Sequence, residues 1–106
     1  MQELHVFCYD SARVVLRSQP RALASSAGAF KRPPVVADFS LDGALPCMLC
    51  SVHLKSGPAG ARAEARTLGR VTLPALVAEH GARARNVIFA GDVRLLFSPA
   101  VLSPNA

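Results

Sequence analysis

Two apolar stretches decide the fold: Met48-Leu49-Cys50-Ser51-Val52-His53-Leu54-Lys55 and Asn86-Val87-Ile88-Phe89-Ala90-Gly91-Asp92. Both are typical of strands covered on both faces, and they carry His53 and Asp92 near their carboxyl ends. Residues 61–80 lie between them and show apolar positions at intervals of three and four, which predicts a helix. Strands joined through a helix usually neighbour each other in one sheet. We therefore expect His53 and Asp92 to meet at one sheet edge.

Upstream of the helix, short apolar and β-branched runs predict four strands: residues 4–9, 13–16, 35–39 and 47–54. The first two form a predicted hairpin, and residues 18–28 are rich in Ser, Ala, Gly and Pro, which favours a loop. Asp42-Gly43 is a strong hairpin signal between the other two strands. The element order is ββ-ββ-α-β, which is an α/β fold class.

The helix should be interrupted, because Pro74 lacks a backbone donor and is expected to kink or split it near Thr72. Gly81 is a plausible end signal. Several charged residues are expected on faces away from the core: Arg62, Glu64, Arg66, Arg70 and Glu79. Residues 86–90 form the last predicted strand, and residues 93–106 receive no predicted structure.

Composition fits one globular domain, with 106 residues, 51% hydrophobic content and a formal net charge of +5. The positive charge indicates either an ordinary solvated surface or a track for nucleic acid. No run approaches the roughly 20 apolar residues of a membrane-spanning helix. No secretory signal pattern opens the chain, which favours an intracellular location. Nothing in the sequence indicates an oligomeric state.

The cysteines, Cys8, Cys47 and Cys50, are odd in number, which argues against a disulfide framework. Cys47 and Cys50 are three apart on a predicted strand, so they should point to opposite faces. Buried structural thiols are the main interpretation, and a redox or metal role is the alternative.

Four blocks in order resemble the endonuclease/exonuclease/phosphatase superfamily, most closely its deoxyribonuclease I-like members: residues 30–36, 50–55, 62–65 and 86–92. The resemblance covers about residues 3–92, the middle portion of such a domain. It implies a hydrolase, a magnesium-dependent phosphodiesterase or nuclease on a four-layer α/β sandwich, with DNA among the possible substrates. In this family the metal stabilises charge on the scissile phosphate, and a histidine–carboxylate pair activates water.

The resemblance implies that His53 and Asp92 are catalytic, with His53 contacting the phosphate and Asp92 supporting the metal indirectly. Arg32 matches an arginine of structural role. For each residue alone, an ordinary structural histidine or a turn aspartate is the alternative.

Departures from the family pattern are also clear. Arg94 stands where the family has asparagine, and Glu3 is a poor match for the metal-binding glutamate. The block with a second aspartate and histidine has no counterpart, since neither His5 nor His80 occupies an equivalent place.

These observations predict a partial catalytic domain over residues 1–92 followed by an irregular tail over residues 93–106. The expected function is that of a truncated phosphodiesterase, weak or inactive alone. One alternative is a non-enzymatic basic module that binds nucleic acid or protein, and another is a chain without a stable fold.

Overall fold

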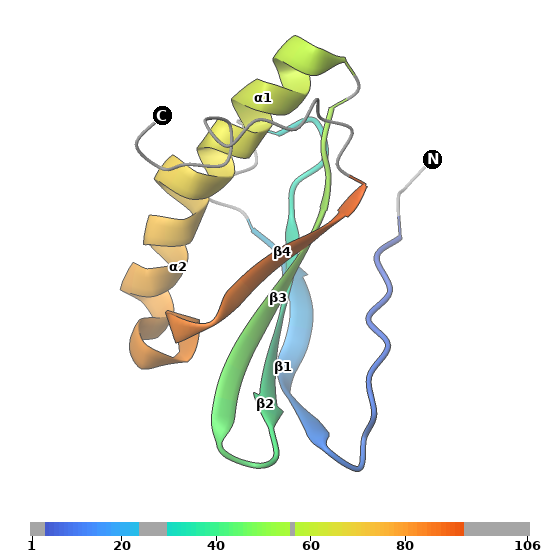
Figure 1. Ribbon diagram of the computed structural model, residues 1–106, viewed down its shortest axis with the longest axis vertical. Helices are drawn as coiled ribbons and strands as arrows, with labels where there is room; N and C mark the ends of the chain where they lie inside the picture. Colours follow the sequence, from blue (N-terminus) through green and yellow to red (C-terminus); the bar gives the residue numbers. More distant parts are fainter. Residues whose placement is uncertain (1–3, 24–29, 56, 93–106) are drawn as a thin grey trace.

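The computed structural model describes residues 4–23, 30–55 and 57–92. They form a small mixed α/β domain in which a helix covers one face of a four-stranded sheet (Figure 1). The strands are β1 Val14–Ala22, β2 Val35–Leu41, β3 Leu45–His53 and β4 Val87–Asp92. They lie in the order β1-β2-β3-β4, with β1, β2 and β3 antiparallel and β4 parallel to β3.

The turn between β2 and β3 confirms the predicted hairpin. Asp42 and Gly43 have φ angles of 50° and 76°, and the Ala44 amide donates to the Leu41 carbonyl at 3.1 Å. Two consecutive positive φ values match the right-handed twist of the flanking strands, and an Asp-Gly pair tolerates them at low cost.

The helical segment is continuous but changes its winding. It consists of α1 Pro58–Thr67, the π-helical turn η2 Leu68–Thr72 and α2 Leu73–His80, followed by the 3-10 turn η3 Gly81–Arg85. The expected break near Thr72 is confirmed, because the π turn ends there and Pro74 stands in the first turn of α2. α2 ends at His80, and Gly81 has a positive φ of 59°, as expected of a helix stop.

The core lies between this helix and the facing side of the sheet. It comprises Leu23, Phe30, Val36, Met48, Cys50, Val52, Leu54, Ala61, Ala65, Leu68, Leu76 and Ala84. Glu64 is only 4% exposed, so its expected place on a solvent face was wrong. Within the described residues no helix is long and apolar enough to cross a membrane.

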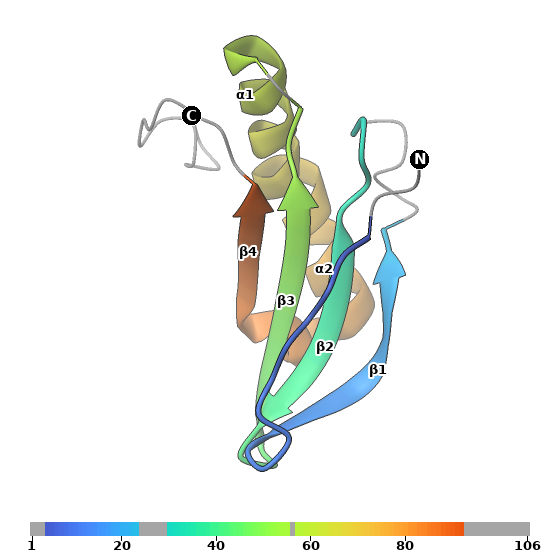
Figure 2. The ribbon, with the colours of Figure 1, turned by 90° about the vertical axis from the view of Figure 1, so that its right-hand side faces the viewer.

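The N-terminal hairpin prediction was wrong. Residues 4–10 form no strand and instead cross the sheet face opposite the helix (Figure 2). The rings of Phe7 and Tyr9 lie 6.3 Å and 5.0 Å from that of Phe39, between ring centroids. Alternating apolar residues thus pack on the face of the sheet rather than joining its edge.

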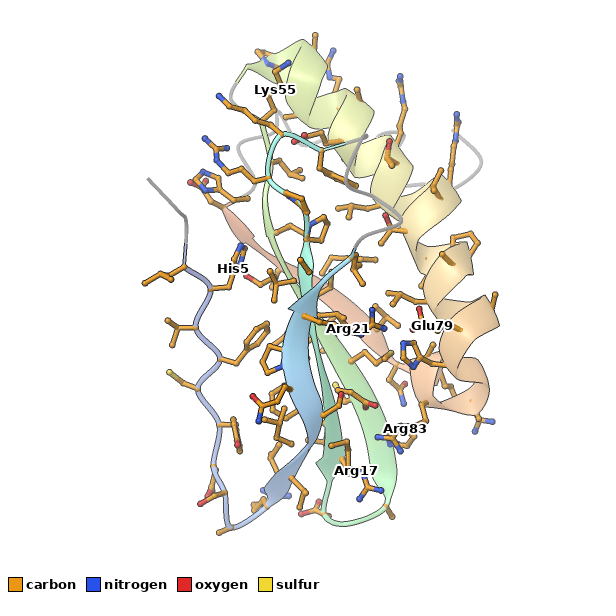
Figure 3. The ribbon with its side chains drawn as sticks, turned by 180° about the vertical axis from the view of Figure 1, so that it is seen from behind. His5, Arg17, Arg21, Lys55, Glu79 and Arg83 are labelled. Carbon is orange, nitrogen blue, oxygen red and sulfur yellow. The ribbon has the colours of Figure 1, made fainter. Side chains whose placement is uncertain are left out.

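The edge strand β1 is longer than expected, because it continues through residues 18–22, which were predicted as a loop. Register shifts between Leu16 and Ser18 and between Ser18 and Arg21 leave room for a proline at this edge. Arg21 then donates to Glu79 at 2.8 Å and ties β1 to α2 (Figure 3). Residues 24–29 lie outside the described part of the chain.

The described residues contain one sheet and one helical layer. The four-layer sandwich therefore stays a prediction, and the predicted tail of residues 93–106 lies outside the described residues.

Candidate functional site

His53 and Asp92 meet at the carboxyl edge of the parallel strand pair, as predicted. They are the last register partners of β3 and β4, and His53 Nε2 lies 3.3 Å from Asp92 Oδ2. The Leu54 amide donates to the Asp92 carbonyl at 3.1 Å, which extends the ladder just past the two side chains. The pair is therefore held by backbone bonds as well as by its own contact.

Gly91 permits the close approach of β4 to β3 beside this pair. Its φ is 146°, and a Cβ built there would lie 2.0 Å from the Val52 carbonyl oxygen. Any side chain at this position would have to push the strands apart, so the residue before Asp92 must be glycine for the pair to form as it does.

An open cavity of about 210 Å³ contains the His53–Asp92 pair. Its lining is Leu4, His5, Val6, Ser51, Val52, His53, Gly91 and Asp92. The side chains of His53 and Asp92 are 32% and 41% exposed, so solvent and a ligand can reach both.

His5 and Ser51 belong to the same cavity, and sequence reasoning missed them. His5 points from the N-terminal segment toward the sheet (Figure 3), and its Nδ1 is hydrogen-bonded to Ser51 Oγ at 2.8 Å. Ser51 is two residues before His53 on β3, so the two side chains share a face. The available signal was the alternation in residues 4–9, which places His5 and Phe7 on one side.

Glu64 holds the chain on either side of the sheet from within the core. Its carboxylate oxygens accept backbone hydrogen bonds from Lys31, at 2.9 Å, and from Lys55. Lys31 precedes β2 and Lys55 follows the end of β3, so one side chain on α1 anchors two connecting segments. Because Lys55 is two residues from His53, this anchor also positions the candidate site.

A second charged pair fixes the other end of β4. Arg83 on η3 donates to both carboxylate oxygens of Asp38 on β2, at 2.9 Å and 2.8 Å. The hydrogen bonds with Asp38 raise the pKa of Arg83, so the guanidinium stays charged. Asn86 adds a hydrogen bond to the Pro46 carbonyl at 3.0 Å, at the point where β4 begins.

Magnesium, which the resemblance implies, does not fit the residues at this cavity. Mg²⁺ requires an octahedral set of oxygen ligands, whereas Asp92 is the one carboxylate in the cavity lining and already contacts His53. Across the described ranges no group of three or more His, Cys, Asp or Glu residues is placed to hold a metal. Glu64 is occupied by backbone amides, and Glu3 and Arg94 lie outside the described residues.

The cysteines support a structural interpretation only in part. Cys50 is buried in the core, and burial raises the pKa of its thiol to about 12. Cys47 pairs with Phe39 and Cys50 with Val36, so the two cysteines occupy opposite faces as predicted. Cys8 is exposed, which corrects the expectation that all three are buried.

Searches with this chain against protein-family models, curated proteins and solved structures found no match.

Proposed function

We propose that this chain is a partial phosphodiesterase-type domain of the endonuclease/exonuclease/phosphatase kind, and that its His53–Asp92 edge binds a phosphate group. The contact between His53 and Asp92 in the open cavity carries the proposal. With Nε2–H donating to the carboxylate, the ring of His53 is fixed in orientation and Nδ1 is left to exchange a proton or a hydrogen bond with a ligand.

Magnesium-dependent hydrolysis by the chain alone should be weak or absent. The cavity lacks the oxygen ligands that a catalytic magnesium ion needs, and no step of the proposal passes through the metal. Binding of a phosphodiester anion at His53 is therefore the activity to test first.

A non-enzymatic basic module is the second candidate, and one observation favours it. Arg62, Arg66 and Arg70 recur every four residues along α1 and η2, and Arg66 and Arg70 are exposed. Residues four apart lie on one helix face, so together with the net charge of +5 these residues form a surface that suits a nucleic-acid backbone.

A titration with dimethyl phosphate, followed by NMR of the histidine rings, separates the two candidates. Saturable shifts of the His53 signals are expected in the original chain and in Arg66→Gln. A matched His53→Gln variant, which can still donate to Asp92, should lose the binding. If His53 does not respond, or if Arg66→Gln abolishes the response, the proposed phosphate site is wrong.

Catalysis is tested with bis(p-nitrophenyl) phosphate in magnesium and in EDTA. We expect at most a slow release of p-nitrophenolate in both. Rapid magnesium-dependent release, lost in both His53→Ala and Asp92→Ala, would contradict the conclusion that the donor set does not fit magnesium.

A further inference from the structure

The cavity contains two imidazoles from different parts of the chain, each held by its own partner. His5 is bonded to Ser51 at 2.8 Å, and His53 contacts Asp92 at 3.3 Å. Ser51 and His53 are separated by one residue on β3, which corresponds to ~7 Å along the strand. His5 and His53 thus approach a common space from neighbouring positions on one sheet face, at a spacing that can admit a phosphate group between them.

Proton transfer by side chains is the chemistry that this arrangement offers. Histidine is the side chain best suited to give and take protons near neutral pH, and a pair can act as base and acid in one reaction. Attack on a DNA phosphodiester needs an activated water molecule, for which the cavity has no metal ligand set. RNA differs because its own 2′-hydroxyl is the nucleophile beside each phosphate.

We propose that this cavity cleaves RNA by metal-independent transesterification, with His5 and His53 as the acid–base pair. The proposal rests on the proposed phosphate binding at His53 and narrows its substrate to a ribonucleotide phosphodiester. With Nδ1–H of His5 donating to Ser51, its Nε2 accepts the 2′-hydroxyl proton. The 2′-oxygen then forms a bond to phosphorus as the bond from phosphorus to the 5′-oxygen breaks.

His53 supplies the proton for the departing 5′-oxygen. Its protonated form is an ion pair with Asp92, and that contact at Nε2 leaves Nδ1–H to donate. The products are a 2′,3′-cyclic phosphate and a free 5′-hydroxyl, so no water, oxidant or metal is consumed. Afterwards His5 carries the extra proton and His53 lacks one, and exchange with solvent restores both because the cavity is open.

The test uses the full chain in EDTA with the dinucleotide uridylyl-(3′→5′)-adenosine and with the same molecule lacking the 2′-hydroxyl. Mass spectrometry should find the cyclic phosphate from the ribose form and no cleavage of the deoxy form. His5→Gln and His53→Gln, which keep a donor toward Ser51 and Asp92, should each lower the rate by about 100-fold or more. His80→Gln, on α2, should cleave like the original chain.

Three results would overturn the proposal: no cleavage, cleavage of the deoxy form, or equal cleavage by all variants, which would mark a contaminating ribonuclease. The deoxy dinucleotide also separates this proposal from phosphate binding. If it shifts the His53 NMR signals while the ribose form stays intact, the phosphate site stands and the transesterification falls. If it shifts none, both fall.

Discussion

Replacement of Glu64 by alanine should destabilise the domain more than any charge-removing change on its surface. The carboxylate is 4% exposed and accepts backbone hydrogen bonds from Lys31 and Lys55. Each buried amide left without an acceptor costs about 1–3 kcal/mol. Lys31 and Lys55 are themselves exposed, so water partly replaces the lost acceptor. The lower end of the range applies, and we expect a loss of about 2–3 kcal/mol in the free energy of unfolding.

Thermal and urea unfolding followed by circular dichroism measure this loss. For a domain of this size about 1 kcal/mol lowers the midpoint by roughly 4–8 °C. Glu64→Gln keeps one acceptor and should lose about half as much. Glu79→Ala is the matched control, because Glu79 is exposed and its ion pair with Arg21 should contribute under about 1 kcal/mol.

The reasoning about Glu64 is refuted if Glu64→Ala and Glu79→Ala unfold at the same temperature. If Glu64→Ala does not fold at all, Glu64→Gln supplies the comparison with the same control. A chain that shows no cooperative unfolding in any form would instead support the alternative of a product without a stable fold.

Gly91→Ala should cost about 1–3 kcal/mol, because its φ of 146° and the nearby Val52 carbonyl oppose a side chain; an unchanged urea midpoint would contradict the close approach of the strands. Iodoacetamide at pH 8 should modify exposed Cys8 in the folded chain but Cys50 only after unfolding, which peptide mass spectrometry can check. Because burial raises the Cys50 pKa from 9.0 to about 12, its contribution to stability persists below pH 9 and declines between pH 9 and 12.

Neighbouring elements were predictable where a local pattern has one structural solution. Asp42-Gly43 specified the hairpin, and the strand–helix–strand order brought His53 and Asp92 to one edge. Glu64 shows what polarity conceals. It stands three residues after Ala61 and four before Leu68, both buried, so spacing placed it on the core face, and only its charge suggested solvent. The partners that satisfy it come from distant backbone, which no local pattern reveals.

The N-terminal segment exposes a different limit. Alternation of apolar residues is the signal of a strand with one buried face, but it states only that alternate side chains are covered. Here Phe7 packs on Phe39, and His5 on Ser51, across the face of the sheet. Whether such a segment pairs with an edge or lies on a face depends on which neighbours remain available, and that is decided by the whole sheet.

The same contact gives the candidate site two halves of unequal rigidity. His53 and Asp92 are fixed by paired strands and by the Gly91 approach, whereas His5 is held through Ser51 on a segment without ladder bonds among the described residues. Leu4 and Val6, on either side of His5, are 85% and 78% exposed, so little apolar burial secures the segment there. Phosphate binding at His53 should therefore persist when the segment is loosened, while any reaction that needs both histidines should be lost. For this reason the binding and cleavage experiments can give different answers.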